Sequence, residues 1–267
     1  MATKRRINDR KGPATAGRKS SPSLEGKAVL ITGGARRVGA AIARALQAAG
    51  ANVMIHHRSS AAEARALASE LNSLRGGSAA LVRADLLDTK QLRAVVDATM
   101  KTFGQLDVLI NNASTFYPTP VGSITEQHWN DLLGTNLKAP LFLSQAAAPA
   151  LRLSRGLILN IADIHGLRPL RRYTTYSVAK AGLIMLTKSL SRELGPHVRV
   201  NAIAPGPVMW PEARADRALQ KKIIDRTQLK RPGSAEDVAR AALFFCADAP
   251  YITGQILAVD GGRSVGW

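Results

Sequence analysis

Short apolar runs alternate with longer amphipathic segments along most of this chain. The runs that predict strands are Ala28–Ile31, Asn52–His56, Ala79–Arg83, Val108–Ile110, Leu157–Ile161, Arg199–Ile203 and Ile256–Val259. Helical spacing of apolar residues covers Val38–Ala49, Ala61–Leu74, Glu126–Leu151 and Tyr173–Leu194. This alternation is typical of a parallel sheet with helices on both faces. We therefore predict the α/β class, with one doubly wound parallel sheet of about seven strands.

The length fits a single α/β domain with an N-terminal tail. The chain has 267 residues, of which 46% are apolar and only 4% aromatic, a composition that suits buried parallel strands. We expect residues 24–267 to form one domain, since no repeat or long linker follows residue 24. Cys246 is the only cysteine, so no intrachain disulfide can form and a reducing, cytoplasmic location is expected. No metal site is expected.

Residues 1–23 form a basic segment. They hold seven Lys or Arg against one Asp, so they carry +6 of the net charge of +18. Such a segment is expected to be a disordered tail with at most nonspecific contacts to nucleic acid or anionic surfaces. It lacks the apolar stretch of a secretory signal, and its Gly and Pro residues disfavour a targeting helix. No apolar run is long enough to predict a membrane span.

A glycine-rich turn joins the first expected strand to the first expected helix, over residues 32–39 (Thr-Gly-Gly-Ala-Arg-Arg-Val-Gly). In such a turn, backbone N–H groups approach a pyrophosphate and the helix N-terminus stabilises its charge. A tight turn without a ligand is the alternative interpretation. The position between a strand and a helix favours a Rossmann-type dinucleotide site.

The end of the second strand indicates which dinucleotide is bound. NAD-binding chains usually place Asp or Glu here for the ribose 2′-hydroxyl, whereas this chain offers His57, Arg58 and Ser59. Guanidinium and hydroxyl groups suit a 2′-phosphate, so we predict NADPH. Ser60 and Glu63 also match a capping box for the next helix, and both interpretations can hold together.

Tyr176 and Lys180 lie four residues apart, on one face of an expected helix. There the ammonium can lower the phenol pKa and make the tyrosine a proton donor near neutral pH. By itself this spacing also describes an ordinary surface pair. Asp163 precedes the tyrosine by thirteen residues, and a carboxylate there suits protonation of a ring nitrogen during C=N reduction better than it suits a developing alkoxide. The alternative is that Asp163 caps a strand end or pairs with a nearby arginine: Arg168, Arg171 or Arg172.

Together these motifs resemble the short-chain dehydrogenase/reductase family over residues 26–267. The matching features are Tyr-x-x-x-Lys, Asn111-Asn112-Ala113, Asn136 at a helix bend and the loop Pro205-Gly206-Pro207-Val208. Three positions depart from the usual pattern: Arg37 replaces a glycine of the turn, Ser114 replaces the glycine after Ala113, and Asp163 replaces a serine.

The departures are similar to those of the pteridine reductases within this family, which carry a segment like residues 112–120 (Asn-Ala-Ser-Thr-Phe-Tyr-Pro-Thr-Pro). The resemblance implies that Ser114 contacts a pterin, that Phe116 stacks on it opposite the nicotinamide, and that Arg37 contacts pterin or phosphate. It implies a catalytic set of Asp163, Tyr176 and Lys180. The implied cofactor-binding residues are Gly33, Arg37, Val38, His57, Arg58, Ser59, Asp85, Leu86, Asn112, Ala113, Tyr176, Lys180, Pro205, Gly206 and Val208.

We therefore predict an NADPH-dependent pteridine reductase that acts on oxidised or dihydropterins, with dihydrofolate as a further substrate. The family resemblance implies a homotetramer built on residues 126–151 and 173–194, and the irregular segment 205–230 is a candidate substrate lid. The first rival is a carbonyl reductase, for example of 3-oxoacyl thioesters. The second is a non-catalytic NADP-binding protein, or a nucleic-acid binder that uses the basic tail.

Overall fold

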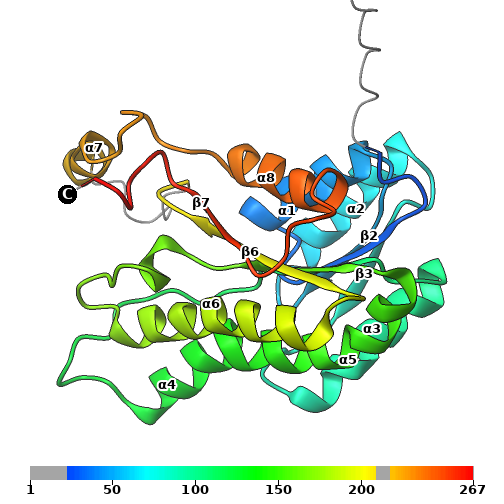
Figure 1. The fold of residues 1–267 in the computed structure, drawn as a ribbon, viewed down its shortest axis with the longest axis horizontal. Helices are drawn as coiled ribbons and strands as arrows, with labels where there is room; N and C mark the ends of the chain where they lie inside the picture. The colour runs from blue at the N-terminus through cyan, green and yellow to red at the C-terminus, as the bar shows by residue number, and fades with distance from the viewer. Residues whose placement is uncertain (1–22, 209–216, 267) are drawn as a thin grey trace, which may run out of the picture.

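The computed structural model describes residues 23–208 and 217–266, and Figure 1 shows their arrangement. Seven parallel strands form one sheet in the order β3-β2-β1-β4-β5-β6-β7. The strands are β1 (Ala28–Ile31), β2 (Asn52–His57), β3 (Ala79–Arg83), β4 (Val108–Asn111), β5 (Leu157–Ile161), β6 (Arg199–Pro205) and β7 (Ile256–Val259). This confirms the predicted fold class. Nearly all of the predicted basic tail lies outside the described residues.

Helices cover both faces of the sheet (Figure 1). On one face lie α1 (Arg37–Ala48), α2 (Ala61–Leu74) and α8 (Ala235–Ala247), and on the other lie α3 (Thr89–Phe103), α5 (Ala139–Ser154) and α6 (Thr174–Leu194). Neighbouring residues of one strand point to opposite faces: Ile31 packs in the first core and Leu30 in the second. Strands buried on both faces explain the continuous apolar runs of the sequence.

The predicted long helix at residues 126–151 is three helical segments in succession: α4 (Glu126–Leu133), a π-helical turn (Gly134–Lys138) and α5. Asn136 lies in the π-helical turn, which confirms the helix-bend prediction for this residue. A further short helix, α7 (Arg217–Asp225), follows the undescribed residues 209–216. None of the described helices combines the length and the apolar character that a bilayer span requires.

The predicted capping box at the start of α2 is wrong. Ser60 forms no side-chain cap hydrogen bond, and its ψ of 55° departs from the extended backbone of a capping serine. The carboxylate of Glu63 instead accepts a hydrogen bond from Arg36 at 3.3 Å. This carboxylate therefore interacts with the Glu63 backbone and with the Arg36 guanidinium, and not with the Ser60 N–H as a capping box requires.

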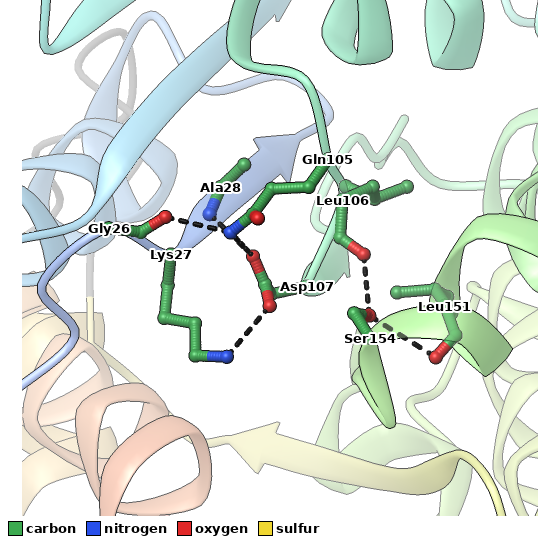
Figure 2. Close-up of polar contacts among 8 residues, drawn as sticks. All are labelled: Gly26, Lys27, Ala28, Gln105, Leu106, Asp107, Leu151 and Ser154. Carbon is green, nitrogen blue, oxygen red and sulfur yellow. Dashed lines mark hydrogen bonds and ion pairs between the residues drawn. The ribbon is translucent and has the colours of Figure 1, made fainter.

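Polar contacts close the amino edge of the sheet, as Figure 2 shows. Asp107, which precedes β4, accepts hydrogen bonds from Lys27 Nζ at 2.9 Å, from the backbone N–H of Ala28 at 2.8 Å and from Gln105 Nε2 at 2.7 Å. The Ser154 hydroxyl donates to the Leu106 carbonyl at 2.8 Å and links α5 to the same edge. At the carboxyl edge, the strand order reverses between β1 and β4. Ligands of open α/β sheets bind at this point.

Candidate active site

A cavity of about 880 Å³ opens at the carboxyl edge of the sheet. Its lining contains every site residue predicted from the sequence. These residues are Gly33, Arg37, Val38, His57, Arg58, Ser59, Asp85, Leu86, Asn112, Ala113, Ser114, Phe116, Asp163, Tyr176, Lys180, Pro205, Gly206 and Val208. Segments spread over most of the chain therefore converge on one concave surface, as expected for an open α/β sheet.

The glycine-rich turn needs two of its glycines for steric reasons. A Cβ on Gly39 would lie 2.4 Å from the Gly33 carbonyl oxygen, and Gly33 has a φ of +59°. Arg37 has a φ of +54°, in the left-handed region that favours glycine. Arginine there costs about 1–2 kcal/mol of backbone strain. The turn thus keeps a glycine-like backbone at residue 37 and places a guanidinium on the cavity wall.

Two side chains, the buried His56 and the half-buried Asn112, hold this turn in place. His56 Nδ1 accepts the Gly33 N–H at 3.2 Å, while its Nε2 lies 3.2 Å from the Ala84 carbonyl. Burial lowers the pKa of His56 to about 4, so the ring is neutral and Nε2 carries the proton. Asn112 Nδ2 donates to the carbonyl oxygen of Gly33 at 3.0 Å. The role of His56 was not predicted, because no sequence motif identifies a histidine that supports a neighbouring loop.

The residues at the end of β2 offer polar groups to a ligand in the cavity. His57 is buried, and its Nδ1 has no hydrogen-bond partner among the described residues. Burial lowers the pKa of His57, and Arg83 and Arg65 lower it further. Arg58 is half-exposed, and its Nη1 lies 3.9 Å from an Asp85 oxygen. A buried ring nitrogen without a partner, beside an exposed guanidinium, matches an anionic ligand that offers several acceptor oxygens.

At the centre of the cavity, Tyr176 and Asp163 share a hydrogen bond. The Tyr176 hydroxyl donates to Asp163 Oδ2 at 2.8 Å, and the His165 N–H donates to Oδ1 at 2.7 Å. Asp163 therefore caps the 3₁₀ turn Ile164–Gly166, where the alternative interpretation expected the cap of a strand end, and it also contacts the tyrosine. The ammonium of Lys180, which is fully buried, donates to the Ile161 carbonyl at 2.9 Å, and burial lowers its pKa to about 8.

The prediction that Lys180 lowers the pKa of Tyr176 is wrong. Burial of the phenol and then the charge of Asp163 and its hydrogen bond raise that pKa well above 10, and a contact with Ser114 acts in the opposite direction. The Lys180 ammonium is engaged with a backbone carbonyl and lies 5.7 Å from the centre of the phenol ring. The carboxylate is therefore the nearer charge, and Tyr176 stays protonated at neutral pH.

An aromatic wall flanks this hydrogen bond. Phe116 stacks on Tyr173, with ring centres 4.6 Å apart and an interplanar angle of 15°, and meets Tyr176 edge-on at 4.8 Å. Phe116 is 46% exposed, so it is not a core residue. Tyr173 lines the same cavity and was missed from the sequence, although its position directly before α6 would have been a usable signal.

Asn136 fixes the loop that carries Ser114. Its Oδ1 accepts a hydrogen bond from the Ser114 hydroxyl at 2.6 Å, and its Nδ2 donates to the Thr115 carbonyl at 3.0 Å and to the Leu132 carbonyl at 2.9 Å. The π-helical turn thus supplies the side chain that positions one wall of the cavity. π-Helical turns are frequent at functional sites for this kind of reason.

The loop after β6 and the C-terminal segment close the other end of the cavity. The Gly206 N–H donates to the Val259 carbonyl at 2.9 Å, and a Cβ on Gly206 would lie 2.6 Å from Asp260 Cβ. Part of the predicted lid, residues 209–216, lies outside the described residues. The rest contributes cavity-lining residues that were not predicted, among them Gln220 and Arg226, and the C-terminal segment contributes Arg263.

Comparison with known proteins assigns the chain to a family. Residues 33–264 match the family model described as enoyl-(acyl carrier protein) reductase. Pteridine reductase 1 of Leishmania tarentolae is 36% identical over 277 residues, which cover 88% of this chain and 96% of that protein. The chain belongs to the short-chain dehydrogenase/reductase family. A 3-oxoacyl-(acyl-carrier-protein) reductase of Staphylococcus aureus is 34% identical over 241 residues, 88% of this chain and 97% of that protein.

The fold and the cofactor agree with this membership. A blue fluorescent protein from a metagenomic library, solved in complex with NADPH, has a TM-score of 0.85 and 33% sequence identity, and the match covers 90% of this chain and 99% of that one. The predicted cofactor, NADPH, is the one bound in that structure. This short-chain dehydrogenase/reductase is thus an oxidoreductase that uses a nicotinamide cofactor. The nearly equal identities to a pteridine reductase and to a 3-oxoacyl reductase leave the substrate to be argued from the site.

Proposed function

We propose that this protein is an NADPH-dependent pteridine reductase that reduces oxidised or dihydropterins, including dihydrofolate, to tetrahydro forms. The observation that carries the proposal is the 2.8 Å hydrogen bond from Tyr176 to Asp163, where family members normally have a serine. When bound, NADPH supplies a hydride to a ring carbon of the substrate. The chain itself must bind a flat ring, orient it and deliver one proton.

The carboxylate of Asp163 favours a nitrogen over an oxygen as the proton acceptor. Negative charge that develops on a carbonyl oxygen would be repelled by a carboxylate at this position. A pterin ring nitrogen becomes basic as the adjacent carbon is reduced, so a protonated phenol can donate to it even with a raised pKa. We assign Tyr176 as the donor, Asp163 as the group that orients the phenol, and Lys180 as the buried cation that partly balances the carboxylate.

A flat heterocycle fits the aromatic wall. Phe116 and Tyr173 form a stacked pair beside Tyr176, and offset stacking of a ring on such a wall contributes about 1 kcal/mol. Ser114 and Arg37 also line this cavity and are candidates for polar contacts with the pterin edge or with phosphate. At the other end, we assign the 2′-phosphate to His57, Arg58 and Ser59.

The deciding experiment measures NADPH oxidation with biopterin, dihydrobiopterin, dihydrofolate and a 3-oxoacyl thioester in parallel. The wild-type protein should reduce the pterins. The variant Asp163→Ser should lower kcat/KM for dihydrobiopterin by about 10²- to 10⁴-fold, the usual range for loss of acid–base assistance. NADPH binding to each variant shows that the protein is folded. The control, Asp97→Ser, changes an exposed aspartate on α3.

The rival function is carbonyl reduction, which the S. aureus relative's name describes for that protein. It predicts the opposite pattern: turnover of the 3-oxoacyl thioester by the wild type, and faster turnover once a serine replaces Asp163. Pterin turnover that is unchanged in Asp163→Ser would reject the assigned roles. Absence of any turnover, with intact NADPH binding, would favour the non-catalytic alternative.

A further inference from the structure

Two arginines of the cavity have no assigned partner. Arg226 follows α7 directly, and Arg263 lies in the segment after β7, and both line the cavity. Hydrogen bonds from the backbone N–H groups of Gln228 and Leu229 to the Gly261 carbonyl, at 2.8 and 3.1 Å, join the two segments. Figure 1 shows α7 and the C-terminal segment together, at the opposite end of the molecule from β2 and α2.

The positive charge at this end of the cavity is only partly offset by the described part of the chain, since Asp260 attracts Arg263. None of the ion pairs among the described residues includes Arg226 or Arg263. The nearby carboxylate of Asp260 is already engaged, because it accepts the N–H groups of Gly262 at 2.9 Å and Ser264 at 2.7 Å. Partial burial, and then the charge of Arg226, lower the pKa of Arg263, which indicates that the two guanidinium groups repel each other. An anion placed between them would relieve this repulsion.

The nucleotide end of the cavity has its own cations. Arg37 and Arg58 come from α1 and from the turn after β2, next to the glycine-rich turn and the unpartnered His57. Arg226 and Arg263 come from the other side, where the loop Pro205–Val208 and α7 border the cavity. They are therefore placed to meet a group that extends from the substrate.

We propose that Arg226 and Arg263 form a subsite for the carboxylate or phosphate at the end of a pterin side chain. The inference rests on the proposed pterin reductase function and adds a preference to it: pterins with an anionic side chain bind better than those with a neutral one. Guanidinium groups bind both anions with paired hydrogen bonds, so carboxylate and phosphate are distinguished by experiment.

The test compares kcat/KM at saturating NADPH for three substrates of different side-chain charge. Dihydrobiopterin has a neutral side chain, dihydrofolate carries carboxylates, and dihydroneopterin monophosphate carries a phosphate. In Arg226→Gln/Arg263→Gln, the ratio of kcat/KM for the preferred anionic substrate to that for dihydrobiopterin should fall about 10- to 100-fold, as expected for the loss of charged hydrogen bonds. Whichever anionic substrate shows the fall identifies the natural group.

Two further variants control for charge. Arg226→Lys/Arg263→Lys keeps both positive charges and should recover part of the ratio. Arg93→Gln/Arg152→Gln removes two charges from exposed positions on α3 and α5, outside the cavity, and should keep the wild-type ratio.

Other outcomes overturn the subsite. A wild-type ratio in Arg226→Gln/Arg263→Gln would reject it, and so would a rise in the KM for NADPH that accounts for the whole loss, since the arginines would then serve the cofactor. Pterin turnover by the wild type with either of these results would leave the proposed function intact. If the wild type reduces no pterin, the proposed function and the subsite are both rejected.

Discussion

Two aspartates at opposite edges of the sheet have different tasks. Asp107 lies just before β4 and accepts hydrogen bonds from Lys27, the Ala28 backbone and Gln105 (Figure 2). Asp163 lies two residues after β5 and accepts one hydrogen bond from the backbone and one from the Tyr176 hydroxyl. The first carboxylate links segments that are already packed together. The second holds a titratable side chain in a cavity.

The same contrast extends to the groups around each aspartate. In Figure 2, the polar groups of the amino edge contact one another within the fold. At the carboxyl edge, His57 Nδ1 lacks a partner among the described residues, and Lys180 is a buried cation bonded to a backbone carbonyl. Unsatisfied polar groups reduce stability, and they persist where a ligand can satisfy them. The difference between the edges indicates which of the two aspartates belongs to a binding site.

Replacing Asp107 should destabilise the amino edge of the sheet and leave the catalytic rate unchanged. In Asp107→Ala, the buried Ala28 N–H loses its acceptor, Lys27 loses its ion pair and Gln105 keeps only its bond to the Gly26 carbonyl, which should lower the free energy of unfolding by about 3–4 kcal/mol. Urea denaturation measures this loss. The kcat per folded molecule should equal that of the wild type, because the cavity lies at the other edge. The control is Asp97→Ala on α3, and a loss of kcat larger than the loss of folded protein would contradict this division of roles.

The sequence predicts the sheet and the shared cavity well, because both depend on local signals. Continuous apolar runs locate the strands, and Gly33 and Gly39 mark a turn in which a side chain at either position would be strained or would clash. Helix α3 was missed although Leu92, Val95 and Val96 have helical spacing. In contrast, the raised pKa of Tyr176 depends on its burial and on where the Lys180 ammonium points, and neither can be read from their spacing.

The residues missed at the site were missed for a related reason. Tyr173 contacts Phe116 from a position 57 residues later in the chain. Arg226 and Arg263 line one cavity only because the segment after α7 pairs with the C-terminal loop. Such contacts are tertiary, so no local pattern indicates them. His56 is a similar case. Its neighbour His57 matched a phosphate-binding pattern, whereas His56 supports the glycine-rich turn by accepting a hydrogen bond from the Gly33 N–H.

Acid should destabilise the folded protein because His56, at the carboxyl edge of the sheet, is buried in its neutral form. Its pKa is about 4 in the folded protein and about 6.5 in the unfolded chain, so between these values the unfolded state binds more protons. The free energy of unfolding should therefore be largest above pH 6.5 and fall by about 3 kcal/mol as the pH drops to 4. His57, whose pKa is also lowered, contributes with the same sign.

The variant His56→Asn separates the two histidines. Its side-chain oxygen can still accept the Gly33 N–H but does not titrate, so most of the acid-dependent loss should disappear from urea denaturation curves between pH 7 and 4. The wild type should also lose NADPH affinity as the pH falls from 7 to 4, and His56→Asn should lose less, since Gly33 lies at the expected pyrophosphate site. An identical pH profile in the variant and the wild type would show that His56 does not control this edge.

The smallest expected effect concerns the unpartnered nitrogen of His57. If Nδ1 donates to the 2′-phosphate, His57→Ala should raise the KM for NADPH about 10-fold, or about 1–2 kcal/mol, and leave the KM for NADH unchanged. His57→Asn places an amide N–H near the same point and should recover part of the affinity. The control is His197→Ala, which removes an exposed histidine just before β6, at the amino edge. Equal effects on NADPH and NADH would mean that His57 has a structural role, as Asp107 does, and that the contrast between the edges does not extend to it.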